Sequence, residues 1–205
     1  MIDFKLYVIT ERNLCYPTPL LSVISDIIQV GVKAIQLREK DLDSKDLYKL
    51  AYPISELCRV NDVSLYINTN IQVAIDIGAV GIHLPDIDLT IEESMKGFNA
   101  DLQVGCSIHD IKSAKKREVE GADFLTYSPI FPIQSKPESG SGVGLESLSD
   151  LVGKVSLPVF ALGGITHAKV QGCLDVGAAG IAVMSGIMSP TSSVDRTLKY
   201  LDVLD

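Results

Sequence analysis

The chain has 205 residues, of which 46% are apolar and 21% charged, a composition typical of one globular domain and unlike a disordered or collagenous chain. Acidic residues outnumber basic ones by 26 to 18, and a net charge of −8 disfavours attraction to a nucleic-acid backbone. Aromatic residues make up 6% and Trp is absent, which disfavours stacking platforms for bases. We expect a single domain over residues 1–205 that binds no nucleic acid.

The cysteines and the N-terminal segment indicate an intracellular protein. The four cysteines are Cys15, Cys58, Cys106 and Cys173, and no two of them have zinc-ligand spacing. We therefore expect four reduced thiols, of which three are buried. Asp3 and the lack of a long apolar core disfavour a signal peptide. No apolar run reaches the roughly 18 residues that span a bilayer. We therefore expect a cytoplasmic protein without membrane contact.

Short apolar runs alternate with helical patterns along the chain. Little polar alternation within a run is typical of strands buried on both faces. The predicted strands are 5–10, 34–38, 64–68, 81–84, 102–107, 124–130, 158–162 and 181–185. Apolar stripes at helical spacing occupy 20–28 and 47–57 between them.

Glycines punctuate this pattern, because Gly31, Gly78, Gly121 and Gly177 each follow a helical segment and precede a strand. Eight strands in 205 residues leave about 26 residues per strand–helix unit, which suits a compact (β/α)8 TIM barrel. A doubly wound open sheet is the alternative.

Polar residues gather where the predicted strands end, which is where such barrels place their chemistry. Period-two alternation puts Gln36, Arg38 and Lys40 on one side, a plausible anion pocket. Asp86 and Asp88 follow the fourth strand and could hold Mg2+ or cap the next helix. Other polar residues at strand ends are Asn68, Ser107, His109 and His83, the last expected as a satisfied core histidine.

Glycine and serine after the last two strands suggest a phosphate site. Gly163-Gly164 follows the seventh strand and Ser185-Gly186 the eighth, and barrels often bind phosphate there through backbone N–H groups. A second anion site would combine residues from other strand ends with Lys136 of the Ser-, Gly- and Pro-rich segment 132–144. Two anion sites and a candidate Mg2+ site suggest a phosphate ester meeting a pyrophosphate.

These residues resemble the thiamin phosphate synthase/TenI superfamily over nearly the whole chain. The motifs are QLREK (36–40), IN (67–68), GIHL (81–84), VGCSIH (104–109), GADFLTYSPIFP (121–132), GLESL (144–148) and PVFALGGI with GAAGIAVMSGI. The resemblance implies a Mg2+-dependent enzyme that joins hydroxymethylpyrimidine pyrophosphate to thiazole phosphate and releases pyrophosphate. A homodimer is a further possibility.

The same resemblance implies roles for individual positions. Gln36 corresponds to the pyrimidine contact, and Asp88 to one Mg2+ ligand. The pyrophosphate contacts would be Arg38, Lys40, Asn68, Ser107 and Lys136, with Arg38, Lys40 and Lys136 assisting catalysis, and Ser135 retains one loop hydroxyl. The thiazole-phosphate cradle would be Gly164, Met184 and Ser185.

Several positions depart from the synthase pattern. Thr69 stands where a second Mg2+-binding Asp is usual, and a neutral hydroxyl there should weaken metal binding. Ser128 replaces a Gly, Pro85 replaces another, and Ile133-Gln134-Ser135 replaces Thr-x-Thr.

Two other functions stay open. A TenI-like thiazole tautomerase needs an acid–base group and no Mg2+, and its usual histidine position is Pro129 in this chain, as in synthases. A non-catalytic protein that binds thiazole or thiamin phosphate would tolerate Thr69.

Overall fold

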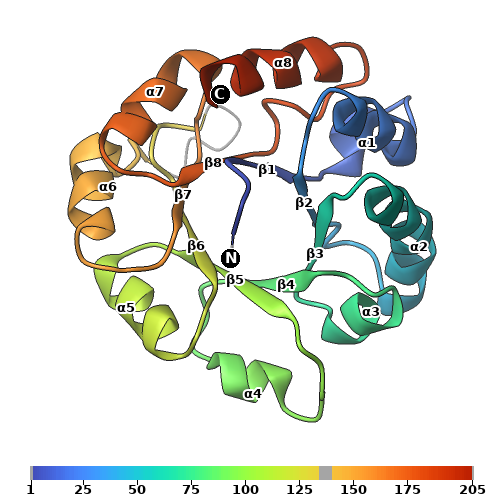
Figure 1. The fold of residues 1–205 in the computed structure, drawn as a ribbon, viewed down its shortest axis with the longest axis horizontal. Helices are drawn as coiled ribbons and strands as arrows, with labels where there is room; N and C mark the ends of the chain where they lie inside the picture. The colour runs from blue at the N-terminus through green and yellow to red at the C-terminus, as the bar shows by residue number, and fades with distance from the viewer. Residues whose placement is uncertain (1, 134–139, 205) are drawn as a thin grey trace.

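A computed structural model describes residues 2–133 and 140–204. Eight parallel strands form one closed barrel in chain order, and helices surround it as an outer ring (Figure 1). The strands are β1 (Leu6–Ile9), β2 (Ala34–Leu37), β3 (Ser64–Asn68), β4 (Gly81–Leu84), β5 (Gln103–Ile108), β6 (Phe124–Tyr127), β7 (Val159–Leu162) and β8 (Gly180–Val183).

The helices follow the strands as the predicted alternation requires. They are α1 (Leu20–Gln29), α2 (Ser44–Val60), α3 (Ile71–Asp76), α4 (Ile91–Met95), α5 (Ile111–Val119), α6 (Gly144–Val152), α7 (His167–Asp175) and α8 (Ser193–Leu204), with a short 3-10 helix η1 (Arg12–Cys15) after β1. The TIM barrel is confirmed. The open-sheet alternative is wrong, because Leu6 of β1 pairs with Ile181 of β8 and closes the sheet.

The strand boundaries shift by a few residues from those expected. The sixth strand ends at Tyr127 rather than at residue 130, since Pro129 has no N–H for a strand ladder. The four punctuating glycines have φ between +63° and +111°, the left-handed conformation expected of them after a helix.

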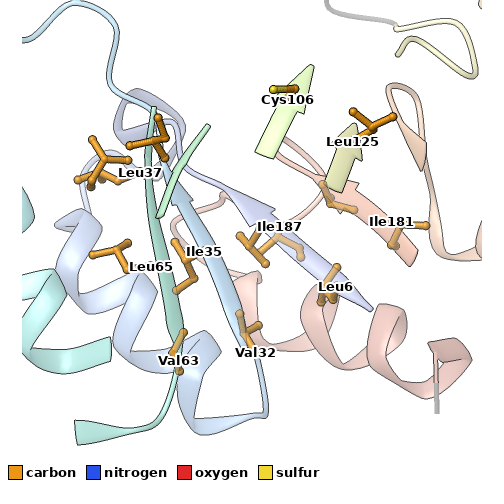
Figure 2. Close-up of a cluster of buried hydrophobic side chains, with 14 of the residues drawn as sticks. Leu6, Val32, Ile35, Leu37, Val63, Leu65, Cys106, Leu125, Ile181 and Ile187 are labelled. Carbon is orange, nitrogen blue, oxygen red and sulfur yellow. The ribbon is translucent and has the colours of Figure 1, made fainter. Parts of the chain in front are cut away.

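Two apolar clusters stabilise the barrel. The larger one lies between the strands and the helices, and Figure 2 shows part of it, including Ile35, Leu65 and Ile181. All four cysteines are buried, so the expectation of three was too low. The smaller cluster fills the barrel interior and consists of Phe4, Tyr7, Ile9, Ala34, Tyr66, Phe124, Phe160 and Ala182.

Within residues 2–133 and 140–204, no helix is long and apolar enough to cross a bilayer.

Candidate active site

The floor of the candidate site is a cluster of aromatic rings inside the barrel. Phe124 makes edge-to-face contacts with Phe4, Tyr7 and Tyr66, with ring centroids 5.3 to 5.8 Å apart. A Cβ on Gly81 would come within 2.8 Å of the Tyr66 ring. Side chains therefore fill the barrel interior, and we expect a ligand to bind above the rings, at the carboxyl ends of the strands, which we call the mouth of the barrel.

Strand alternation carries the predicted anion-binding residues above this floor. Ala34 belongs to the inner cluster, so Gln36 and Arg38 at i+2 and i+4 continue along the inner face of β2 and the turn after it. By the same argument Asn68 follows Tyr66 on β3. The structure thus directs these three predicted side chains to the same end of the barrel.

The lowest polar layer of the site is buried. Gln36 is 1% exposed and His83 is 2% exposed. His83 Nε2 lies 3.1 Å from Ser107 Oγ and 3.3 Å from Thr126 Oγ1. Burial and the nearby Arg38 charge lower the pKa of His83 to about 3, so its imidazole is neutral at pH 7. The expected satisfied core histidine is confirmed.

A buried glutamate fixes the turn between the two predicted cations of β2. Glu39 Oε1 accepts a 2.6 Å hydrogen bond from Thr10 Oγ1, and its carboxylate also pairs with Arg12 at 3.0 Å. Thr10 Oγ1 in turn accepts from the Arg38 backbone N–H at 3.0 Å. Because Glu39 lies between Arg38 and Lys40 in sequence, its bonds to Thr10 and Arg12 position the backbone that carries both cations. Sequence reasoning passed over Glu39, although its place inside QLREK was a signal.

Lys40 and Asn68 line one hollow of about 240 Å³ at the barrel mouth. Thr69 and Asn70 line it from the β3 side. The hollow therefore joins a cation, an amide and a hydroxyl that the resemblance assigns to pyrophosphate and Mg2+ binding.

Thr69 has a strained backbone with φ of +60°, which is unusual for a β-branched residue. Its hydroxyl donates to the Asn68 carbonyl at 2.8 Å, and its N–H donates to the His83 carbonyl at 3.1 Å. The turn thus keeps a conformation that Asn or Asp would adopt with less strain.

The two aspartates after β4 have different surroundings. Asp86 Oδ2 accepts from the His109 backbone N–H at 3.1 Å, whereas Asp88 is solvent-exposed. Neither caps the next helix, since Thr90 is the N-cap of α4; that part of the alternatives was wrong. Asp110 caps α5 by accepting a hydrogen bond from the Ser113 N–H.

A buried arginine that sequence reasoning missed organises the loop carrying Asp88. Arg117 of α5 is 1% exposed and donates to the carbonyls of Pro85, Ile87 and Leu89 at 2.9 to 3.2 Å. It also pairs with Glu120 at 2.8 Å. In sequence it lies in the run KSAKKREV, whose charges gave no signal of burial.

The donor set tests whether a metal could bind. Among residues 2–133 and 140–204, no group of three or more His, Cys, Asp or Glu side chains could hold a metal ion. Mg2+ needs only one or two carboxylates when substrate phosphates and water complete its shell. Such an ion would take Asp88 as its carboxylate, as the resemblance implies, and its other ligands from a pyrophosphate and water.

The predicted phosphate cradle would draw on the loops after β7 and β8. Gly163 and Gly164 have φ of +94° and +63°, and a Cβ on Gly164 would lie 2.5 Å from the Pro132 carbonyl. The two glycines thus allow the loop after β6 to pack closely against this turn. Ser185 is exposed and Met184 half-buried, beside the inner cluster.

Two cations not anticipated from the sequence contact this cradle. Lys169 Nζ donates to the Gly164 carbonyl at 3.0 Å and lies 4.3 Å from the centre of the Phe131 ring. Arg196 contacts the Ser185 carbonyl at 3.4 Å. The sequence predicted anion-binding cations at strand ends and in the segment 132–144, whereas these two residues belong to α7 and α8.

His109 has a structural role at the mouth: its Nδ1 donates to the Ser128 carbonyl at 2.8 Å. The predicted Ser135 and Lys136 lie outside the described residues.

Comparisons with known proteins identify the family of the chain. A family model described as thiamine monophosphate synthase matches residues 6–187. A candidate thiamine-phosphate synthase 2 of Aquifex aeolicus is 42% identical, covering 88% of this chain and 96% of the relative. The thiamine-phosphate synthase of Desulfitobacterium hafniense is 33% identical, covering 92% and 91%. A thiamine phosphate pyrophosphorylase from Pyrococcus furiosus superposes with a TM-score of 0.87 at 30% identity, covering 98% and 95%.

Proposed function

Because the chain belongs to the thiamine monophosphate synthase/TenI family and is homologous to thiamine-phosphate synthases over nearly its whole length, we propose that it makes thiamin phosphate from hydroxymethylpyrimidine pyrophosphate and thiazole phosphate. The observation that carries this proposal is the set of polar side chains that lies above the aromatic cluster at the mouth of the barrel. Arg38, Lys40, Asn68 and Ser107 offer cations and donors above a dry aromatic floor.

The reaction needs charge stabilisation more than proton transfer. The bond between the pyrimidine methylene carbon and the pyrophosphate oxygen breaks, and its electron pair leaves with pyrophosphate. The thiazole nitrogen then donates its lone pair to the carbocation. Arg38 and Lys40 stabilise the charge that develops on the leaving group, and the site holds both substrates in line. A His83 with a pKa near 3 suits such a mechanism, because so weak a base takes protons from the carbocation poorly.

Each substrate has its own anion site in this proposal. Asn68, Ser107 and Lys136 hold the pyrophosphate beside the two cations of β2. Gly164, Met184 and Ser185 hold the thiazole phosphate at the opposite side of the mouth, and Gln36 contacts the pyrimidine. Bound Mg2+ would neutralise charge on the leaving pyrophosphate. Asp88 would ligate that ion, and Thr69 supplies no charge at the second ligand position.

The test is thiamin phosphate formation by the purified chain, detected as fluorescent thiochrome. We expect Mg2+-dependent product, and loss of most of it in Arg38→Ala. Arg59→Ala removes an exposed cation paired with Glu56 on α2 and serves as the control. Absence of product in the wild-type chain, with both substrates and Mg2+ saturating, would overturn the proposal.

His109 favours the tautomerase as the second candidate. In the neutral ring, donation from Nδ1 to Ser128 makes Nε2 the acceptor nitrogen, and the ring is exposed at the mouth. This function predicts proton exchange on a thiazole carboxylate phosphate without Mg2+, abolished in His109→Gln.

A further inference from the structure

A buried chain of hydrogen bonds crosses the barrel beneath the predicted pyrophosphate contacts. Gln36 Nε2 donates to the Tyr7 hydroxyl at 3.3 Å, and that hydroxyl lies 3.4 Å from His83 Nδ1. On the other side of the ring, His83 Nε2 lies 3.1 Å from Ser107 Oγ. Thr126 Oγ1 donates to the same Ser107 oxygen at 3.4 Å. The chain thus connects the predicted pyrimidine contact to a predicted pyrophosphate contact.

The donors in this chain determine the histidine tautomer. Gln36 uses its amide N–H on the Tyr7 oxygen, so Tyr7 has its own proton left to give. The acceptor within reach is His83 Nδ1. A neutral imidazole has one N–H, which must then be on Nε2, where Ser107 Oγ at 3.1 Å is the nearer acceptor and Thr126 Oγ1 lies at 3.3 Å.

The tautomer in turn determines the direction of the Ser107 hydroxyl. A serine oxygen accepts two hydrogen bonds and donates one. His83 and Thr126 supply two donors to Ser107 Oγ, so its own proton cannot point back into the barrel. We propose that His83 is a positioning residue, held by Tyr7 as the Nε2–H tautomer, that turns the Ser107 hydroxyl toward the mouth as a donor to the pyrophosphate. This inference rests on the proposed function.

The fold makes room for this arrangement. A Cβ on Gly105, two residues before Ser107 on β5, would lie 2.7 Å from His83 Nδ1 and 2.3 Å from the Phe124 ring. Tyr7 and Thr126 are fully buried. The imidazole is therefore confined by packing, and it stays neutral because a charged ring would be buried near Arg38.

The opposite tautomer makes a distinct prediction. With the proton on Nδ1, His83 Nε2 would accept from Ser107, and the serine proton would point inward, away from any anion. Tyr7 would then receive two donors and have no described acceptor for its own proton. The two tautomers differ in which ring nitrogen bears hydrogen, which is measurable without catalysis.

Nitrogen-15 NMR of the histidine rings gives the first test. Three histidines are present, and loss of signals in His83→Gln assigns this ring. We expect a protonated Nε2 and an unprotonated Nδ1 in the wild-type chain. In Tyr7→Phe we expect a mixture of tautomers, because the proton that selects one is gone. A protonated Nδ1 in the wild-type chain would overturn the inference.

A double-mutant cycle gives the second test. Ser107→Ala should lower kcat/KM for the pyrimidine pyrophosphate roughly ten- to hundredfold, as expected for a hydrogen bond to a charged group. Tyr7→Phe should lower it about five- to twentyfold and leave the KM for thiazole phosphate unchanged. In the Ser107→Ala background, Tyr7→Phe should have almost no further effect, because Tyr7 acts through Ser107.

Tyr127→Phe is the matched control. It removes one buried hydroxyl, whose partner is Ser147 Oγ at 2.8 Å, from the cluster between the strands and the helices. We expect unchanged kinetics. Multiplicative effects of Tyr7→Phe and Ser107→Ala would overturn the inference.

Failure of the proposed function is distinguishable from failure of this one. If the wild-type chain makes no thiamin phosphate, calorimetry with inorganic pyrophosphate and Mg2+ replaces the rate in the same cycle. Weaker binding in Tyr7→Phe that vanishes in the Ser107→Ala background would still support the positioning role. Equal binding by the wild-type, Tyr7→Phe and Ser107→Ala chains would overturn it.

Discussion

Replacing Arg117 with leucine should destabilise the barrel by an amount that its contacts allow us to work out. The guanidinium is 1% exposed and serves three loop carbonyls together with Glu120. Arg117→Leu leaves those carbonyls without their donor, and it leaves the Glu120 carboxylate, 13% exposed, with Lys116 at 3.9 Å and the Ile91 N–H at 3.3 Å in place of its 2.8 Å partner. Removing one partner of a buried pair costs about 3–5 kcal/mol. For a domain of this size that corresponds to a fall in Tm of very roughly 10 °C.

Two further variants separate the causes. The double variant Arg117→Leu with Glu120→Leu also removes the Glu120 carboxylate, so we expect about half of the lost stability to return. Arg59→Leu breaks an exposed pair with Glu56 on α2 and should cost less than about 1 kcal/mol.

Urea unfolding followed by circular dichroism measures all three variants. The reasoning is wrong if Arg117→Leu loses no more stability than Arg59→Leu. It is also wrong if the double variant is less stable than Arg117→Leu alone, because the Glu120 carboxylate would then not be a source of the lost stability.

Four other predictions concern the site. Thr69→Asp should lower the Mg2+ concentration for half-maximal activity. Thr69→Asn relieves the same backbone strain of about 1 kcal/mol without adding charge, and it should leave that concentration unchanged. The same Mg2+ dependence in both variants would exclude Thr69 from the metal site. Arg38→Ala should cut turnover far more than thiazole-phosphate affinity measured by calorimetry, and the reverse pattern would exchange the two anion sites. Ser185→Asp should abolish thiazole-phosphate binding by like-charge repulsion, and unchanged affinity would remove Ser185 from the cradle. His83 has a pKa of about 3 when folded against 6.5 ordinarily, so its stabilising effect is complete above pH 6.5 and is lost as pH falls, by up to about 2.7 kcal/mol at pH 4.5. The unfolding free energy of His83→Gln should fall less between pH 7 and 4.5 than that of the wild-type chain, and equal falls would contradict the buried neutral ring.

The sequence by itself determined the repeating strand–helix pattern and the strand ends at which the candidate site lies. These are local properties: the run 65–67 is buried and bears no charge, and Gly78 follows a helix where a left-handed cap is needed. Alternation along β2 was enough to place Gln36 and Arg38 on one side. Most candidate ligands were therefore found from strand ends alone.

Only the tertiary structure decided which of the remaining polar groups are buried and what they contact. Arg117 is polar in a polar helix, and its burial follows from a loop 28 to 32 residues earlier that turns its carbonyls inward. Likewise, Tyr7 and His83 are 76 residues apart, and the closed barrel brings them together. Hydrogen-bond direction depends on such long-range neighbours, because a donor or acceptor is defined by its partner in space. The residue types could be read from the chain, but their roles depend on contacts that form only when the barrel closes.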